Sequence, residues 1–258
     1  MKGRVNRLRR GLLAALATGL LTSPPVVANL VDTVASIKPS VLAVGTFLPT
    51  RSPQFRFLGT GFVVGDGNQL ATNVHVLASA EPRAANERVV VVLPGVGRVN
   101  VRAVEREVRD MDHDLAVLRF AGAPLPPLAL AGSDSAPDGL EIALTGFPLG
   151  ATLGVIPSTH KGIISATVPA GVPLNSSAQL DSATVRRLTA GARFDLLQLD
   201  VVSYPGNSGS PVYDTSTGEV HGVINMVLVN GIRQNAVINP SRISYAVPVI
   251  HLKALLAR

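Results

Sequence analysis

The stretch from Tyr204 to Asp214, YPGNSGSPVYD, places two glycines, two prolines and an asparagine around Ser208, next to a short apolar run. Glycine tolerates backbone angles that other residues avoid, and proline presets φ, so the chain is predicted to turn sharply here. One interpretation is an ordinary surface turn. The other is a nucleophile on a tight turn whose neighbouring N–H groups point at one spot. The second interpretation requires a base and a carboxylate elsewhere in the chain.

The sequence outside this stretch consists mainly of short β-rich runs separated by Gly, Pro, Asn and Asp. Their number and spacing predict an all-β barrel or sandwich architecture. The Pro-rich segment Ala121 to Gly139 lacks strand periodicity, so we expect two β domains, 29–122 and 139–258, joined by a connector over 123–138. The chain ends with apolar residues at helical spacing, which predict a short C-terminal helix on the second domain: Val249, Leu252, Leu255 and Leu256.

The first 28 residues have the pattern of a signal peptide. Five basic residues precede an apolar run from Gly11 to about Leu21, and small residues follow up to Ala28. The run is shorter than the roughly 20 residues that a membrane span needs. We therefore expect cleavage near Ala28 and an exported product, periplasmic or secreted, without stable membrane insertion. An uncleaved anchor is the alternative, and Arg9-Arg10 hints at twin-arginine export.

The charge balance depends on this cleavage. The whole chain has 23 Lys plus Arg and 17 Asp plus Glu, but five of the basic residues lie in the first 28, which leaves 18 against 17. The basic character of the whole chain therefore gives no reason to expect nucleic acid as a partner. The chain has no cysteine, which excludes a disulfide framework and a thiolate metal site.

Two residues that precede Ser208 in the sequence have the surroundings expected of the base and the carboxylate. His75 follows two predicted strands joined by a Gly65-Asp66-Gly67-Asn68 hairpin turn, and it lies in a short apolar turn at the end of the second strand. Imidazole titrates near neutral pH, which suits a general base. Asp114 directly precedes an apolar strand, where a buried carboxylate needs a cationic or N–H partner. The alternatives are a structural histidine and a solvated aspartate.

A calcium loop starting at Asp110 is excluded. Asp110, Asp112 and Asp114 have the spacing of the first ligands, but the sixth position is Leu115 instead of glycine and Ala121 occupies the position of the bidentate glutamate. No other metal site and no cofactor is expected.

Taken together, the segments GTGFVVGDGNQLATNVHV, DHDLAVLRF, PLPPLALAGSDSAPDG and PGNSGSPVYDTSTGEVHGVIN resemble the chymotrypsin-fold serine proteases, most closely the HtrA/Deg type. The resemblance covers about Leu30 to Leu256. It implies two six-stranded antiparallel β-barrels with a short C-terminal helix. The order His, Asp, Ser along the chain belongs to this two-barrel fold.

The resemblance also implies roles for individual residues. His75 is the implied base, Asp114 orients it, and Ser208 attacks the peptide carbonyl. The N–H groups of Gly206 and Ser208 are the expected oxyanion donors. Protein or peptide substrates are implied, and an apolar, shallow specificity pocket is expected from Val202, Val223, Ile224 and Asn225.

Three points leave alternatives open. Ser210 stands where the family usually has a second glycine, a variant that resembles the glutamyl endopeptidases, although His221 is out of register with their pocket histidine. A protease-like fold acting as a binding or chaperone-like module is the alternative from another class. The segment Pro169 to Asp195 is longer than the corresponding family loop and forms either a substrate-gating loop or a passive excursion. The PDZ domain usual in the HtrA/Deg type is not expected here, and the oligomeric state is not predicted.

Overall fold

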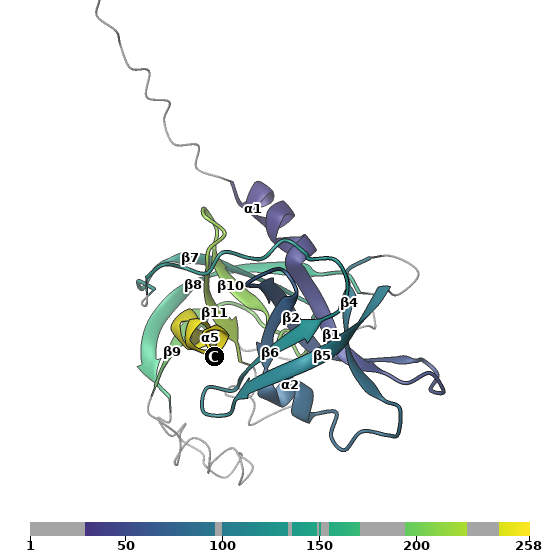
Figure 1. The fold of residues 1–258 in the computed structure, drawn as a ribbon. Helices are drawn as coiled ribbons and strands as arrows, with labels where there is room; N and C mark the ends of the chain where they lie inside the picture. Colours follow the sequence, from purple (N-terminus) through teal and green to yellow (C-terminus); the bar gives the residue numbers. More distant parts are fainter. Residues whose placement is uncertain are drawn as a thin grey trace, which may run out of the picture.

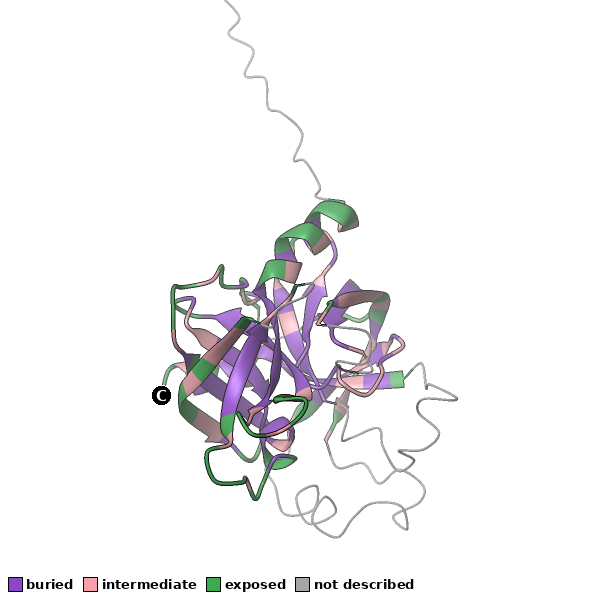
Figure 2. Ribbon diagram, turned by 90° about the vertical axis from the view of Figure 1, so that its right-hand side faces the viewer, coloured by how far each residue is buried: buried purple, intermediate pink, exposed green. Residues whose placement is uncertain are grey.

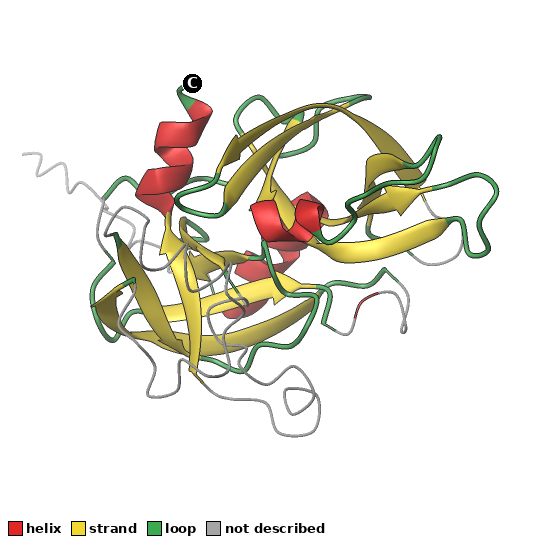
Figure 3. Cartoon of the chain, turned by 90° about the horizontal axis from the view of Figure 1, so that it is seen from below, coloured by secondary structure: helices red, strands yellow, loops and turns green. Residues whose placement is uncertain are grey.

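The computed structural model describes residues 29–95, 100–133, 136–148, 150, 155–170, 194–225 and 243–258. The expected signal peptide and most of the segment Pro169 to Asp195 lie outside these residues. The strands in the described ranges form two closed antiparallel barrels of six strands each. The predicted all-β, two-barrel fold is confirmed, and Figure 3 shows the two groups of strands with short helices beside them.

The first barrel follows a short helix and contains six strands in the order β1-β2-β3-β6-β5-β4. Its elements are α1 (Leu30–Ile37), a 3-10 turn (Lys38–Ser40), β1 (Val41–Phe47), β2 (Phe55–Val64), β3 (Gln69–Asn73), α2 (Val74–Ala78), β4 (Arg88–Leu93), β5 (Asn100–Asp110) and β6 (Leu115–Phe120). The predicted Gly65–Asn68 turn joins β2 and β3, with Gly65 and Gly67 at positive φ.

The second barrel contains six strands in the order β10-β11-β12-β9-β8-β7. Its elements are β7 (Glu141–Gly146), β8 (Ser158–Pro169), β9 (Asp195–Asp200), β10 (Pro211–Asp214), β11 (Val220–Ile224), β12 (Ile243–Pro248) and α5 (Val249–Leu256). The last strand of the first barrel ends at Phe120 and the first strand of the second begins at Glu141, which agrees with a connector between the barrels. The boundaries of this connector, 123 and 138, remain predictions.

Each barrel has its own apolar interior, and a third cluster joins the two barrels. Along β2, Val63 faces the interior of the first barrel, whereas Phe62 and Val64 belong to the shared cluster. This split follows from the two-residue period of a strand, which turns alternate side chains to opposite faces. The interior of the second barrel contains Leu144 and Leu199. Figure 2 shows that buried residues run along the strands, whereas exposed residues concentrate on α1 and the loops.

Of the two terminal helices, α5 was predicted from the sequence and α1 was not. The helix α1 is capped by the side chain of Asn29, which accepts a hydrogen bond from Asp32 N at 3.0 Å, and it is tied to the second barrel by Thr33 Oγ1, which donates to Thr215 O at 2.9 Å. The predicted helix α5 is present, but it contacts β5 and β6 of the first barrel as well as β11 and β12 (Figure 1).

Candidate active site

Ser208 lies on a tight turn between β9 and β10. Asn207 N donates to Tyr204 O at 3.0 Å and Ser210 N donates to Asn207 O at 2.9 Å. Gly206 has a φ of 103°, in a region that favours glycine. A Cβ at this position would lie 2.2 Å from Phe147 O. Both the conformation and the available space therefore require glycine two residues before the serine.

A strand of the first barrel holds this turn of the second barrel in place. Thr60 N, on β2, donates to Ser208 O at 2.9 Å, and Thr60 Oγ1 donates to Gly206 O at 2.7 Å. The same hydroxyl accepts a hydrogen bond from Phe147 N at 3.2 Å. Ser208 is therefore fixed by contacts across the junction between the barrels. Thr60 was missed in the sequence analysis, because nothing local to it indicates a partner 148 positions away.

His75 links the serine to the aspartate. The sequence analysis placed it in a turn, and it lies on the short helix α2, which follows β3 directly. Its Nε2 is 2.9 Å from Ser208 Oγ, and its Nδ1 is 2.5 Å from Asp114 Oδ2. Its backbone N–H also donates to Asp114 Oδ1 at 2.9 Å. The imidazole is thus held between a hydroxyl and a carboxylate, which is the geometry for moving a proton from the serine to the ring.

Asp114 precedes β6 and is surrounded by hydrogen-bond donors. Its carbonyl oxygen accepts from Val74 N at 3.2 Å and from Asn73 Nδ2 at 3.1 Å, which ties it to the start of α2. Its Oδ2 also accepts a hydrogen bond from Asn225 Nδ2 at 3.0 Å. Asn225 was expected to line a specificity pocket, which stays a prediction, and its amide contacts the carboxylate that faces His75.

The two N–H groups expected to bind the oxyanion are free to donate, as far as the described part of the chain shows. Among the described residues, the backbone N–H groups of Gly206 and Ser208 donate no hydrogen bond. Ser208 itself is only 8% exposed. Two free donors beside a nucleophile in a mostly dry site suit the stabilisation of a developing negative charge.

The other residues expected to line the pocket differ in burial. Val223 and Ile224 are fully buried in apolar clusters, and Val202 is half-buried. Residues 226–242, which follow β11, lie outside the described residues. The composition of the specificity pocket therefore remains a prediction.

Two half-buried histidines of the second barrel have lowered pKa values. Burial lowers the pKa of His160, on β8, below its ordinary value. Burial also lowers the pKa of His221, on β11, and the nearby Asp214 opposes this shift. Both rings are therefore uncharged at neutral pH.

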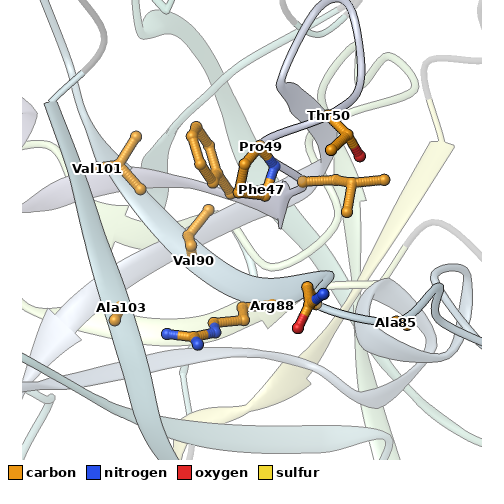
Figure 4. A pocket seen from close by; sticks show the side chains of 10 residues that line it. Phe47, Pro49, Thr50, Ala85, Arg88, Val90, Val101 and Ala103 are labelled. Carbon is orange, nitrogen blue, oxygen red and sulfur yellow. The ribbon is translucent and has the colours of Figure 1, made fainter.

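A cavity of about 530 Å³ lies on the first barrel, apart from these groups. Its walls include Phe47, Arg88, Val90, Val101 and Ala103, and Figure 4 shows Val90 between the ring of Phe47 and the side chain of Arg88. None of His75, Asp114 and Ser208 lines it, so it is distinct from the candidate active site.

A protein-family model matches the part of the chain that contains the candidate active site. The sequence model described as "Trypsin-like peptidase domain" matches residues 59–223, which include His75, Asp114 and Ser208. The chain is 29% identical over 172 residues to a "Probable periplasmic serine endoprotease DegP-like" of Halomonas elongata, covering 67% of this chain and 30% of that protein. It is 28% identical over 239 residues to "Serine protease HTRA3" of Rattus norvegicus, covering 88% of this chain and 46% of that protein.

Solved structures with the same fold include Deg5, with a TM-score of 0.58 and 23% identity over 87% of this chain and 90% of the Deg5 chain. A serine endoprotease from Yersinia pestis matches with a TM-score of 0.59 and 23% identity, over 89% of this chain and 66% of that one. At this identity the likeness concerns the fold alone. The chain spans about a third of the length of the DegP-like relatives.

Proposed function

The chain belongs to the trypsin-like peptidase family, and from this premise we propose that it is an exported serine endopeptidase that hydrolyses peptide bonds of proteins. The observation that carries the proposal is the position of His75, whose two ring nitrogens lie 2.9 Å from Ser208 Oγ and 2.5 Å from Asp114 Oδ2. These three side chains come from three separate parts of the fold.

In the proposed reaction, Ser208 Oγ attacks the substrate carbonyl while its proton passes to His75 Nε2. The carbonyl oxygen becomes an oxyanion, which accepts hydrogen bonds from Gly206 N and Ser208 N. His75 then returns the proton to the leaving amine, and the C–N bond breaks to leave an acyl-enzyme. Water, deprotonated by the same imidazole, attacks the ester and releases Ser208 with its proton.

Asp114 has two tasks in this sequence. By accepting the hydrogen bond of Nδ1–H, its carboxylate selects the tautomer in which Nε2 is free to accept the serine proton, and it stabilises the imidazolium that forms. Asn225 Nδ2 and His75 N also donate to this carboxylate. They fix both of its oxygens, so the carboxylate cannot rotate away from the ring.

The test is covalent labelling of the chain from Asn29 to Arg258 with a fluorophosphonate, beside an assay of casein cleavage. An activated serine displaces fluoride and forms a stable phosphonyl ester, and peptide mapping should find this ester on Ser208. Absence of label on a folded chain, together with no cleavage of casein, would instead support a binding or chaperone-like module. Label on a different serine would refute the assignment of Ser208.

For specificity, we propose an apolar primary pocket that accepts Val, Ala, Ile or Leu. Support comes from Val202, six residues before the nucleophile. A preference for glutamate is the alternative suggested by Ser210, but the half-buried His221, whose pKa is lowered by desolvation, offers no charge to a glutamate side chain at neutral pH. A fluorogenic peptide library should therefore show cleavage after small aliphatic residues. Preferred cleavage after Glu, Arg or Lys would contradict the apolar pocket.

The proposed location is the periplasm or the exterior of a bacterial cell. The curated relatives of Halomonas elongata and Ectopseudomonas mendocina are named periplasmic, and the N-terminal 28 residues have the pattern of an export signal. Within the described ranges, no helix has the length and apolarity that a membrane crossing requires. The proposed partners are protein substrates.

A further inference from the structure

Asp114 has an unfavourable backbone conformation. Its φ is 54°, in the left-handed region that non-glycine residues rarely adopt. Such a conformation persists only when the surrounding structure enforces it, and it is common at functional sites. Its hydrogen bonds to Val74 and Asn73 hold one side of the residue. On the N-terminal side, Asp114 is preceded by the short loop that follows β5.

The carboxylate of Asp110 closes this loop. Asp110 is 5% exposed, and its Oδ1 accepts hydrogen bonds from Asp112 N at 3.1 Å and from His113 N at 3.2 Å. Its Oδ2 lies 3.0 Å from His113 Nδ1 and 3.4 Å from Arg258 Nη2. The residue directly before Asp114 is therefore held by both its backbone and its ring.

The ring of His113 is stacked on a residue from the end of the chain. His251, on α5, lies with its ring centroid 3.9 Å from that of His113 and the two planes at 20°. The edge of the pair is covered by Phe194, whose centroid is 4.7 Å from His113 and 5.4 Å from His251. We call Asp110, His113, Phe194 and His251 the histidine clamp.

The clamp connects the two barrels at the candidate active site. His113 belongs to the loop before β6 of the first barrel, whereas His251 belongs to the helix after β12 of the second. The helix is anchored by Val249, Leu252 and Leu255, which are buried in the cluster shared by both barrels. The helix therefore presents His251 to the loop as a fixed surface.

We propose that His251 is a positioning residue: by stacking on His113, it holds Asp114 in its left-handed conformation and so keeps the carboxylate on His75. The expected effect on catalysis rests on the proposed peptidase function, whereas the expected effect on the position of Asp114 does not. No described hydrogen bond or ring contact joins the clamp to Ser208, so the clamp acts through Asp114.

The clamp should weaken in acid. Burial, and next the neighbouring His113, lower the pKa of His251 below its ordinary value, while Asp110 and Asp195 oppose the shift. The other charged groups here are Arg258, which faces Asp110, and Lys253 of the same helix, whose Nζ donates to Gly132 O. Because the unfolded state binds the proton more readily, the stabilisation by neutral His251 is present above pH of about 6.5 and declines below it.

The experiment compares His251→Ala, which removes the stack, with His251→Phe, which keeps a flat ring that cannot be protonated. His251→Gln replaces the alanine variant if that one does not fold. The matched control is Lys253→Ala, which changes the same helix but removes only a side chain whose Nζ donates to Gly132 O, outside the histidine clamp. The readouts are kcat and KM for a peptide ester, and the low-field proton NMR signal of the His75 Nδ1–H bonded to Asp114.

At pH 8, the alanine variant should lose kcat roughly 10- to 100-fold with little change in KM, because the catalytic groups are displaced but the substrate site is not. Its low-field signal should shift or broaden, and the phenylalanine variant should restore both readouts. The Lys253→Ala control should keep its signal and kcat. Lowering the pH from 8 to 5.5 should reduce the Tm of the original chain more than the Tm of the phenylalanine variant.

The proposal is overturned if the His251→Ala variant keeps both kcat and the low-field signal, or if Lys253→Ala loses them to the same extent. The NMR signal does not depend on turnover. If the original chain takes no fluorophosphonate label, the peptidase function fails while the signal still decides whether the clamp positions Asp114.

Discussion

Replacement of Ser208 by alanine is expected to lower kcat for casein by about 10⁶-fold without unfolding the protein. Among the residues that the structure describes, its hydroxyl bonds to His75 Nε2 alone, at 2.9 Å, whereas the turn is held by backbone atoms, including Ser208 O, which accepts from Thr60 N. Removing Oγ therefore removes the nucleophile and leaves the scaffold. Assays of casein cleavage and fluorophosphonate labelling on both chains test the loss of activity and of the nucleophile. Thermal unfolding of both chains tests whether the fold is kept.

Ser210→Ala is the matched control for this substitution. Ser210 lies two residues further along the same turn, is fully buried, and its Oγ has no hydrogen-bond partner in the part of the chain that the structure describes. Removing a buried, unpaired hydroxyl is close to neutral for stability. This variant should cleave casein and take label like the original chain. Retained cleavage by the Ser208 variant would show that another residue is the nucleophile.

Replacement of Asp114 by asparagine is expected to lower kcat by about 10⁴-fold at neutral pH. Asparagine has the same size and tolerates positive φ, so the left-handed backbone at this position is preserved. An amide group facing His75 Nδ1, however, no longer selects the tautomer that leaves Nε2 free to accept a proton. It also weakens the acceptor for two N–H donors, His75 N and Asn225 Nδ2.

Asp112→Asn is the control, because this exposed carboxylate lies two residues away and only its backbone N–H contacts Asp110. Both variants carry the same change of charge in the same loop. The pH profile of kcat/KM, measured from pH 6 to pH 10, should be shifted in the Asp114 variant and unchanged in the control. Equal losses in both variants would assign the effect to loop charge and not to the tautomer of His75.

The sequence predicted those parts of the fold that depend on neighbouring residues. The β2–β3 hairpin follows from Gly65 to Asn68, and the helix α5 follows from the spacing of Val249, Leu252 and Leu255. By contrast, α1 was missed. It has only eight residues, too short to be stable alone, and its stabilising contact to Thr215 comes from the other barrel.

For the candidate site, the sequence by itself determined which residue types are available and in which order, because the glycine-rich turn at Ser208 and the flanks of His75 and Asp114 are local patterns. Only the tertiary structure decided their geometry. Ser208 lies 133 residues beyond His75 in the chain, and they meet because two barrels pack against each other. The roles of Thr60, Asn225 and His251 arise in the same way, since each acts on a residue more than a hundred positions away. Contacts of this kind depend on how the closed barrels dock, a property of the whole buried surface that no local segment encodes.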